Sequence, residues 1–247
     1  MADLILPDRK LEMPSSYYPG RQPTGNTKIN WDNRFTKNLI GYWSFAQKDG
    51  LIDKVHSVPA TFINSAYVTQ NPSSVSTDRN GLGYIKITDA VGRYQGSTAG
   101  GQTVSFFIKP TPIEVWDTFL CYGYGMINKK GWRVGYGGLL TQIIFTGYST
   151  YKAVNIGNYN RWLWITLTMN DAVPEIKLYI DGNFIDILPI TVDTVTDYPN
   201  ITIGTNIAES INYATLDIKD LIIHKRVLQA NEIKELHANP YQFLTKV

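Results

Sequence analysis

Apolar and polar positions alternate with a period of two along most of the chain beyond residue 37. The stretch "EIKLYIDGNFIDI" shows this clearly, because Ile176, Leu178 and Ile180 alternate with more polar neighbours. A period of two places these apolar side chains on one face of a β-strand. Asp181 and Gly182 follow, and this pair tolerates the positive φ angles of a type I′ turn. The stretch therefore predicts a β-hairpin.

Similar short runs, separated by Gly-, Pro- and Asn-rich breaks, fill the rest of this region. Such runs are typical of an all-β sandwich, here with about a dozen strands. One run carries Trp162 and Trp164 on one face and Leu163 and Ile165 on the other, which predicts a strand buried on both sides and a packing role for the tryptophans. The predicted strand regions are 39–45, 58–70, 83–90, 102–111, 117–125, 130–138, 140–148, 151–157, 161–170, 175–187, 201–206 and 213–228.

A helical pattern occurs close to the C-terminus, in "LQANEIKELHANP". Ile233 and Leu236 recur there at helical spacing. Gln229 is the predicted N-cap and Glu232 the third helical residue, which together form a weakened capping box. Pro240 should end the helix.

The first 37 residues lack a sustained period and contain several prolines. They predict either a disordered tail or an extended arm that lies along a surface. The number of apolar side chains favours the arm, because few such residues occur in a solvated tail. The predicted plan is an arm at 1–37, a sandwich domain at 38–241 and a short tail at 242–247. The anchoring residues of the arm would be Leu4, Leu6, Leu11, Tyr17, Tyr18 and Trp31.

Composition narrows the class of protein. The 247 residues are 43% hydrophobic and 18% charged, as expected of a folded chain with a sizeable core. The net charge of +2 is spread along the chain, which gives no indication of nucleic acid as a partner. No segment reaches the length of a transmembrane helix, and the N-terminus lacks the pattern of a signal peptide, so we expect folding in a cytoplasm and no membrane partner. The single cysteine, Cys121, excludes an internal disulfide and is expected to be a buried thiol.

Catalytic motifs are missing from the sequence. A retaining glycosidase needs two carboxyl groups about 5 Å apart, whereas Asp217 and Asp220 would lie on opposite faces of a regular strand. No histidine spacing indicates zinc, and no Gly-x-Ser-x-Gly elbow indicates a serine hydrolase. His224, beside two basic residues, is expected at a solvated strand end. The sequence predicts a protein that binds and is not an enzyme.

Aromatic residues make up 13% of the chain and suit surfaces that meet sugars or proteins. Exposed Tyr or Trp rings can stack on pyranose rings. The Gly-rich stretch "YGYGMINKKGWRVGYGG" offers four candidate glycan-binding residues, Tyr122, Tyr124, Trp132 and Tyr136. The alternative is that these rings pack against one another inside the sandwich.

Three blocks, in order, resemble laminin-G-like, concanavalin A-like jelly-roll domains over roughly residues 38–241. "NLIGYWSFAQKDGLIDKV" is similar to their aromatic-rich opening strand. "NRWLWITLTMNDAVPEIKLYIDGNFID" is similar to their central pair of strands, the second of which ends in Tyr-x-Asp-Gly. "TLDIKDLIIHKRVLQANEIKELHANPYQFL" resembles their closing strand and helix. The resemblance implies a two-sheet antiparallel jelly-roll sandwich.

The lead that contains Trp31, Asn33 and Thr36 resembles more narrowly the laminin-G-like proteins of tailed bacteriophages and prophages. This implies a virion protein, assembled in the host cytoplasm, most simply a capsid decoration protein anchored by its arm. The alternatives are an accessory tail or head-fibre protein that binds host surface glycans, and a glycoside hydrolase of the same fold. Its partners would be the major capsid protein or other virion proteins and further copies of itself, for example in a trimer.

Calcium is the one cofactor that the resemblance suggests, since laminin-G-like domains often bind it. Asp53, Asp217 and Asp220 match acidic positions in the family's pattern. Calcium takes about six to eight oxygen ligands, and no Asp-x-Asp-x-Asp loop supplies them here.

Overall fold

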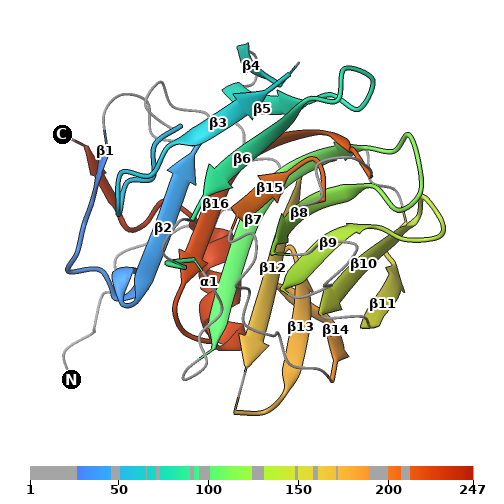
Figure 1. Cartoon of the computed structure of the whole chain (residues 1–247). Coiled ribbons are helices and arrows are strands. Elements are labelled where there is room, and N and C mark those ends of the chain that lie inside the picture. The colour runs from blue at the N-terminus through green and yellow to red at the C-terminus, as the bar shows by residue number, and fades with distance from the viewer. Residues whose placement is uncertain are drawn as a thin grey trace, which may run out of the picture.

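The chain folds into two stacked antiparallel β-sheets (Figure 1). The computed structural model describes residues 27–45, 51–64, 66–70, 73–89, 92–94, 101–123, 131–147, 150–157, 161–170, 172–189, 200–206 and 212–246. All strand pairs within these ranges are antiparallel. The predicted all-β jelly-roll sandwich with one short C-terminal helix is confirmed.

The first sheet, which we call the seven-stranded sheet, has the order β11-β10-β9-β8-β15-β6-β3. Its strands are β3 (Ala60–Ile63), β6 (Tyr84–Thr88), β8 (Thr118–Tyr122), β9 (Trp132–Tyr136), β10 (Gln142–Gly147), β11 (Thr150–Asn155) and β15 (Asn200–Ile203). The second, the eight-stranded sheet, has the order β14-β13-β12-β7-β16-β5-β4, and β2 also pairs with β16. Its strands are β2 (Leu39–Ser44), β4 (Tyr67–Gln70), β5 (Ser73–Thr77), β7 (Gln102–Thr111), β12 (Leu163–Asn170), β13 (Glu175–Ile180), β14 (Asn183–Leu188) and β16 (Thr215–His224).

Alternate positions from both sheets form the main core. Leu120, Val134 and Phe145 are register neighbours on β8, β9 and β10, and all three are fully buried. They belong to one apolar cluster with Phe106 and Leu167 of the eight-stranded sheet. Burial of each such side chain contributes about 1.5–3 kcal/mol. The apolar side chains that recur every second residue therefore hold the two sheets together by packing between them.

A second apolar cluster covers the outer face of the eight-stranded sheet. It includes Trp164 from β12, Phe35 from the 3-10 helix η2 (Arg34–Thr36), and Ile233 from the helix α1 (Ala230–Ala238). Leu163 and Ile165, on the other face of β12, lie in the main core. The prediction that this strand is buried on both sides is confirmed.

The ends of the described chain also join this outer cluster. β1 (Thr27–Ile29) pairs with β17 (Leu244–Lys246), and both Ile29 and Phe243 are buried there. Described residues on both sides of the predicted boundaries at residues 37 and 242 therefore pack together in this cluster. Of the predicted anchoring residues, Trp31 is 58% exposed. The others, Leu4, Leu6, Leu11, Tyr17 and Tyr18, lie outside the described residues.

Helix α1 begins as predicted. The Glu232 carboxylate accepts a hydrogen bond of 2.9 Å from the backbone N–H of Gln229, the N-cap residue, and also pairs with the Arg226 guanidinium. This hydrogen bonding lowers the pKa of Glu232. The helix ends at Ala238, just before Pro240. Within the described ranges no helix is both long and apolar enough to cross a membrane.

The predicted hairpin is also present. Asp181 has φ 51° and Gly182 has φ 76°, the two positive angles of a type I′ turn between β13 and β14. The Asp181 carboxylate in addition accepts a hydrogen bond of 3.0 Å from the backbone N–H of Trp164. The turn thus fixes the end of the neighbouring strand.

Two details differ from expectation. His224 is fully buried, because η2 lies over the end of β16, and its Nε2 is 2.7 Å from the carbonyl oxygen of Phe35. Burial lowers the pKa of His224 to about 4. The predicted strand region at 58–70 divides into β3 and β4 at Asn64, whose φ is 54°.

Candidate functional site

The structure places three of the predicted glycan-binding residues inside the main core. Tyr122, Trp132 and Tyr136 are at most 1% exposed, and all point between the sheets. The Tyr136 ring packs edge-on against Phe119, with 4.7 Å between the ring centroids. These residues cannot form an exposed stacking surface, so the packing alternative is correct for them. Tyr124 lies outside the described residues.

Asp53, the first predicted calcium ligand, is occupied by protein donors. Its carboxylate accepts hydrogen bonds of 2.8–3.0 Å from the backbone N–H groups of Tyr42, Val55 and His56 and from the Tyr94 hydroxyl. The side chain is 1% exposed. It braces the loop after β2 and has no exposed oxygen to offer a metal ion.

Asp217 and Asp220 share one face of β16, contrary to expectation. The register shifts between Ile218 and Asp220, so that Lys219 is an extra bulged residue. Asp217 accepts a hydrogen bond from Ser76. Asp220 is fully buried and accepts one of 2.8 Å from the Tyr241 hydroxyl.

Burial raises the pKa of Asp220 to about 6, although its hydrogen bonds oppose the shift. A sugar could not reach this covered carboxyl group, so Asp217 and Asp220 do not form an accessible acid pair. They also do not meet Asp53: among the described residues, no three His, Cys, Asp or Glu side chains gather as metal ligands. The structure therefore does not bring the three predicted calcium ligands together.

An exposed pair of aromatic rings lies at the other sheet. Trp116, in the loop between β7 and β8, is 38% exposed, and Tyr151, on the edge strand β11, is 53% exposed. Their ring centroids are 5.6 Å apart and their planes meet at 88°. We call this pair the aromatic corner. With two perpendicular exposed rings, a flat ligand with C–H groups on its face can stack on one ring and contact the other with its edge.

Glycine allows the Trp116 loop to lie against β9. A Cβ atom at Gly135 would be 2.1 Å from the carbonyl oxygen of Asp117, so only glycine fits at this crossing. The loop is held by hydrogen bonds from Trp116 N–H to Gly137 O (3.2 Å) and from Tyr136 N–H to Asp117 O (2.8 Å). The position of the corner is thus set by backbone contacts.

A charged group flanks the corner. The Arg79 guanidinium pairs with both Glu114 and Asp117, and also donates 2.9 Å to the carbonyl oxygen of Tyr213. Asp117 is buried, and burial raises its pKa to about 6 against the opposing effect of Arg79. One oxygen of Asp117, Oδ2, has no hydrogen-bond partner. Buried oxygens of this kind normally bind a donor, from water or a ligand.

A row of polar side chains crosses the outer face of the seven-stranded sheet and ends at the corner. Thr202, Cys121, Arg133, Thr146 and Tyr151 are successive register neighbours from β15 to β11. The first four are buried, and Cys121 is the inert thiol that was predicted, 2.9 Å from the Thr202 hydroxyl. Arg133 donates to the carbonyl oxygen of Trp116, and Oγ1 of Thr146 has no partner. The corner therefore adjoins two unpartnered oxygens, on Asp117 and Thr146.

Sequence reasoning missed both rings of the corner. For Trp116 a signal existed, because "KPTPIEVWD" places prolines before it, which indicates a loop where a tryptophan would be exposed. Tyr151 opens a strand whose described side chains are all exposed or half-buried, as in an edge strand. That these two segments meet depends on sheet order, which local pattern does not reveal.

A family described as the concanavalin A-like lectin/glucanases superfamily matches residues 79–234, a range that includes Arg79 and both rings of the corner. Among curated proteins, botulinum neurotoxin type E from Clostridium botulinum and from Clostridium butyricum are each 30% identical over 128 residues. The alignment covers 45% of this chain and 10% of each neurotoxin, so the chain spans about a tenth of these relatives.

Solved structures resemble the chain over a larger share. One comes from work entitled "Cell entry of botulinum neurotoxin type C is dependent upon interaction with two ganglioside molecules", with a TM-score of 0.64 and 19% identity, covering 83% of this chain and 52% of that one. The binding domain of botulinum neurotoxin DC in complex with rat synaptotagmin II gives a TM-score of 0.62 and 18% identity, with the same coverage. This likeness shows the fold, and the chain spans about half of each.

Proposed function

The chain belongs to the concanavalin A-like lectin/glucanases superfamily, and on that basis we propose that it is a non-enzymatic, lectin-like domain that binds surface glycans at the aromatic corner. The observation that carries the proposal is the right-angled exposed pair of Trp116 and Tyr151 beside the exposed ion pair of Glu114 and Arg79. Sugar sites combine an aromatic surface with a small number of placed polar groups. Both components occur here in one place.

The chemistry of the corner fits a sugar in two ways. A pyranose presents C–H groups on one face, which can stack on the indole of Trp116 or the phenol of Tyr151. Its hydroxyl groups can hydrogen-bond to Glu114, whose side chain is 56% exposed, and to Arg79. Arg79 pairs with Glu114 and with the buried Asp117, which limits the reorganisation on binding.

A glucanase is the enzymatic alternative within the superfamily. It needs one carboxyl group as acid and another as base or nucleophile, both open to the substrate. Asp220 is fully buried under Tyr241, and Asp117 and Glu114 are bridged by Arg79. A carboxylate paired with a guanidinium is a poor nucleophile. Binding without hydrolysis is therefore the function that the site supports best.

A glycan array with purified protein tests the proposal. Wild-type protein should bind a defined set of glycans, and Trp116→Ala should lose about tenfold or more in affinity, as expected for an aromatic residue at the centre of a binding site. Trp31→Ala is the matched control, because Trp31 is also exposed but lies in the segment after β1. Equal binding by wild type and Trp116→Ala would rule out the corner as the site.

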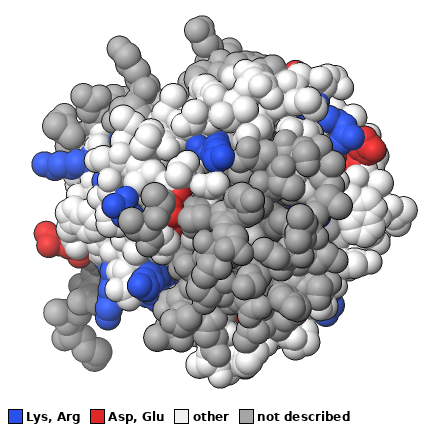
Figure 2. Space-filling view, viewed as in Figure 1, with Lys and Arg blue, Asp and Glu red and all other residues white. Residues whose placement is uncertain are grey.

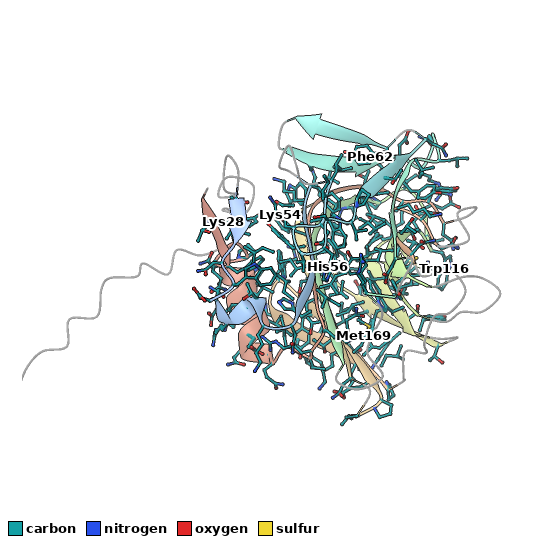
Figure 3. All side chains as sticks on the ribbon, turned by 60° about the vertical axis from the view of Figure 1, so that its left-hand side comes forward. Lys28, Lys54, His56, Phe62, Trp116 and Met169 are labelled. Atoms are coloured by element: carbon teal, nitrogen blue, oxygen red, sulfur yellow. The ribbon has the colours of Figure 1, made fainter. Side chains whose placement is uncertain are left out.

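The positions of β1 and the aromatic corner support a role in which the protein is anchored on the side of β1 and binds glycans at the corner. Lys28, on β1, and Trp116 lie on opposite sides of the sandwich in Figure 3, and β1 and β11, which carries the Tyr151 partner of Trp116, lie on opposite sides in Figure 1. A lectin-like domain on a virion needs such a polarity. We extend the proposal to a virion protein, either capsid decoration or an accessory tail or head fibre, anchored through the segment before β1 to the major capsid protein or another virion protein. The ganglioside and synaptotagmin named for the structural relatives concern those proteins, of which the chain covers half.

Removal of residues 1–26 tests the anchoring role. These residues precede β1, so the domain should keep its thermal unfolding temperature and glycan binding while it is lost from purified particles. Particles that retain the shortened protein at normal copy number would contradict the anchor. Light scattering of both forms measures whether the same segment also holds copies together in a trimer or another oligomer.

A further inference from the structure

A buried lysine on the eight-stranded sheet lies away from the aromatic corner. Lys219 is the bulged residue of β16 and is 1% exposed. Its Nζ lies 4.7 Å from the ring centroid of Trp162, a half-buried residue at the margin of the outer cluster. The Trp162 ring also contacts Phe107, with 4.9 Å between ring centroids. The amine is thus fixed beside one ring at the edge of the outer face.

Within the described part of the chain, the Lys219 amine contacts the Trp162 ring and pairs with no carboxylate. Asp217 and Asp220 lie on either side of it in sequence and favour its charged form, but they are engaged with Ser76 and Tyr241. Burial lowers the pKa of Lys219. An unpaired ammonium group inside a protein is unfavourable, and a cation–π contact offsets only part of this.

A second lysine lies close to the first along the sheet. Lys109 of β7 is the register partner of Asp217 and alternates with Ile108, which faces the main core. Its side chain is therefore on the outer face with Lys219, and it is half-buried. Arg161, which precedes Trp162 just before β12, is already paired with Asp181 at 2.7 Å. Among the described residues, Lys109 and Lys219 are thus two cations of this margin that no carboxylate pairs with.

We propose that Lys219 and Lys109 hold an anionic group, a carboxylate or a sulfate, at the edge of the outer face beside Trp162. Such a group accepts several hydrogen bonds at once, which neither Asp217 nor Asp220 does for the Lys219 amine. The site is on the opposite sheet from the aromatic corner and goes beyond the proposed glycan binding there. A free inorganic anion and the acid group of an acidic sugar share this chemistry.

NMR of the full chain with ¹⁵N-labelled lysine side chains tests the proposal. The Lys219 Nζ resonance, identified by its absence in Lys219→Met, should shift saturably with sodium sulfate or sodium glucuronate and stay unchanged with glucose. A response to sulfate and glucuronate alike indicates the anion itself as the ligand, and a response to glucuronate alone indicates an acidic sugar. No saturable shift with either anion would overturn the proposal.

Variants separate this site from general effects of salt. Lys219→Met keeps an unbranched stem and should fold, since it removes a buried charge; it should lose the saturable rise in unfolding temperature that sulfate gives the wild type. Lys109→Met should weaken the apparent affinity about threefold or more, whereas Lys234→Met, at an exposed position of α1, should match the wild type. A wild-type response in both Lys219→Met and Lys109→Met would refute the site. Trp116→Ala should retain the anion response, so a failure here is distinct from a failure of the corner.

Discussion

Gly135→Ala tests how the aromatic corner is built. The new Cβ atom would lie 2.1 Å from the carbonyl oxygen of Asp117 and 3.0 Å from Cα of Thr118, both backbone atoms. Backbone cannot rotate away as a side chain can, so the loop must retreat from β9 by about 1 Å to restore contact distance. Trp116 moves with this loop.

The size of the effect follows from the contacts that the retreat disturbs. The hydrogen bonds from Tyr136 N–H to Asp117 O and from Trp116 N–H to Gly137 O would lengthen from 2.8 Å and 3.2 Å. Each contributes about 1 kcal/mol net, and the overpacking adds about 1–3 kcal/mol. We expect Gly135→Ala to lower the free energy of unfolding by about 3–5 kcal/mol. For a domain of this size that is a drop of roughly 10 °C in unfolding temperature.

Urea unfolding followed by circular dichroism measures this loss, and glycan affinity should fall with it. Gly138→Ala is the control in the same turn, because its Cβ would meet only Trp116, at an ordinary 3.5 Å. It should change the free energy of unfolding by less than about 0.5 kcal/mol. If Gly135→Ala is as stable as the wild type, or if both variants lose equally, the loop does not rest on β9 in the way described.

Other predictions concern the buried charges. Asp53→Ala should lower the free energy of unfolding by about 3 kcal/mol or more, since it leaves three backbone N–H groups without their acceptor, while added calcium or EDTA should not move the unfolding temperature of the wild type. The pKa of Asp220 is raised from 3.8 to about 6, so its contribution to stability is full below pH 3.8 and is lost as pH rises through 6. The urea midpoint of the wild type should therefore fall between pH 4 and 7, and that of Asp220→Asn should lack this fall. The pKa of His224 is lowered to about 4, so its contribution is present above 6.5 and is lost as pH falls towards 4; His224→Gln should lose less stability over that range, and an unchanged profile would contradict the assignment.

Much of the fold could be predicted from local pattern. The hairpin at Asp181 and Gly182 and the cap at Gln229 and Glu232 depend on neighbours in sequence, and each is present. The strand that contains Trp164 is buried on both faces, and its sequence predicts this because both of its faces are apolar. These features depend on residues a few positions apart, so the hydrophobic period or a two-residue turn motif is enough to predict them.

Features that depend on distant segments could not be predicted. β1 and β17 are short and pair across almost the whole chain, so neither has a period to reveal it. His224 has basic neighbours in sequence and is nevertheless buried, because η2 covers it from far away in the chain. The bulge at Lys219 places Asp217 and Asp220 on one face, where regular alternation separates them.

The site was mispredicted for a related reason. Tyr122, Trp132 and Tyr136 are aromatic residues near glycines, a composition shared by exposed platforms and packed cores. Whether such a ring is exposed or buried depends on which alternate positions of its strand face the core. Neighbouring glycines do not indicate which positions these are. Charge gives no further guide, because the described Lys and Arg side chains in Figure 2 are scattered and do not merge into one patch.

The most direct test of glycan binding at the aromatic corner is ¹⁹F NMR of protein labelled with 5-fluorotryptophan. The chain has six tryptophans, each giving one resonance that a single substitution can assign. On titration with a glycan that the array identifies, the Trp116 resonance should shift saturably, while those of Trp43 and Trp132, buried in the main core, stay fixed. A bound glycan that leaves the Trp116 resonance in place, or moves only another tryptophan, would show that the ligand sits elsewhere.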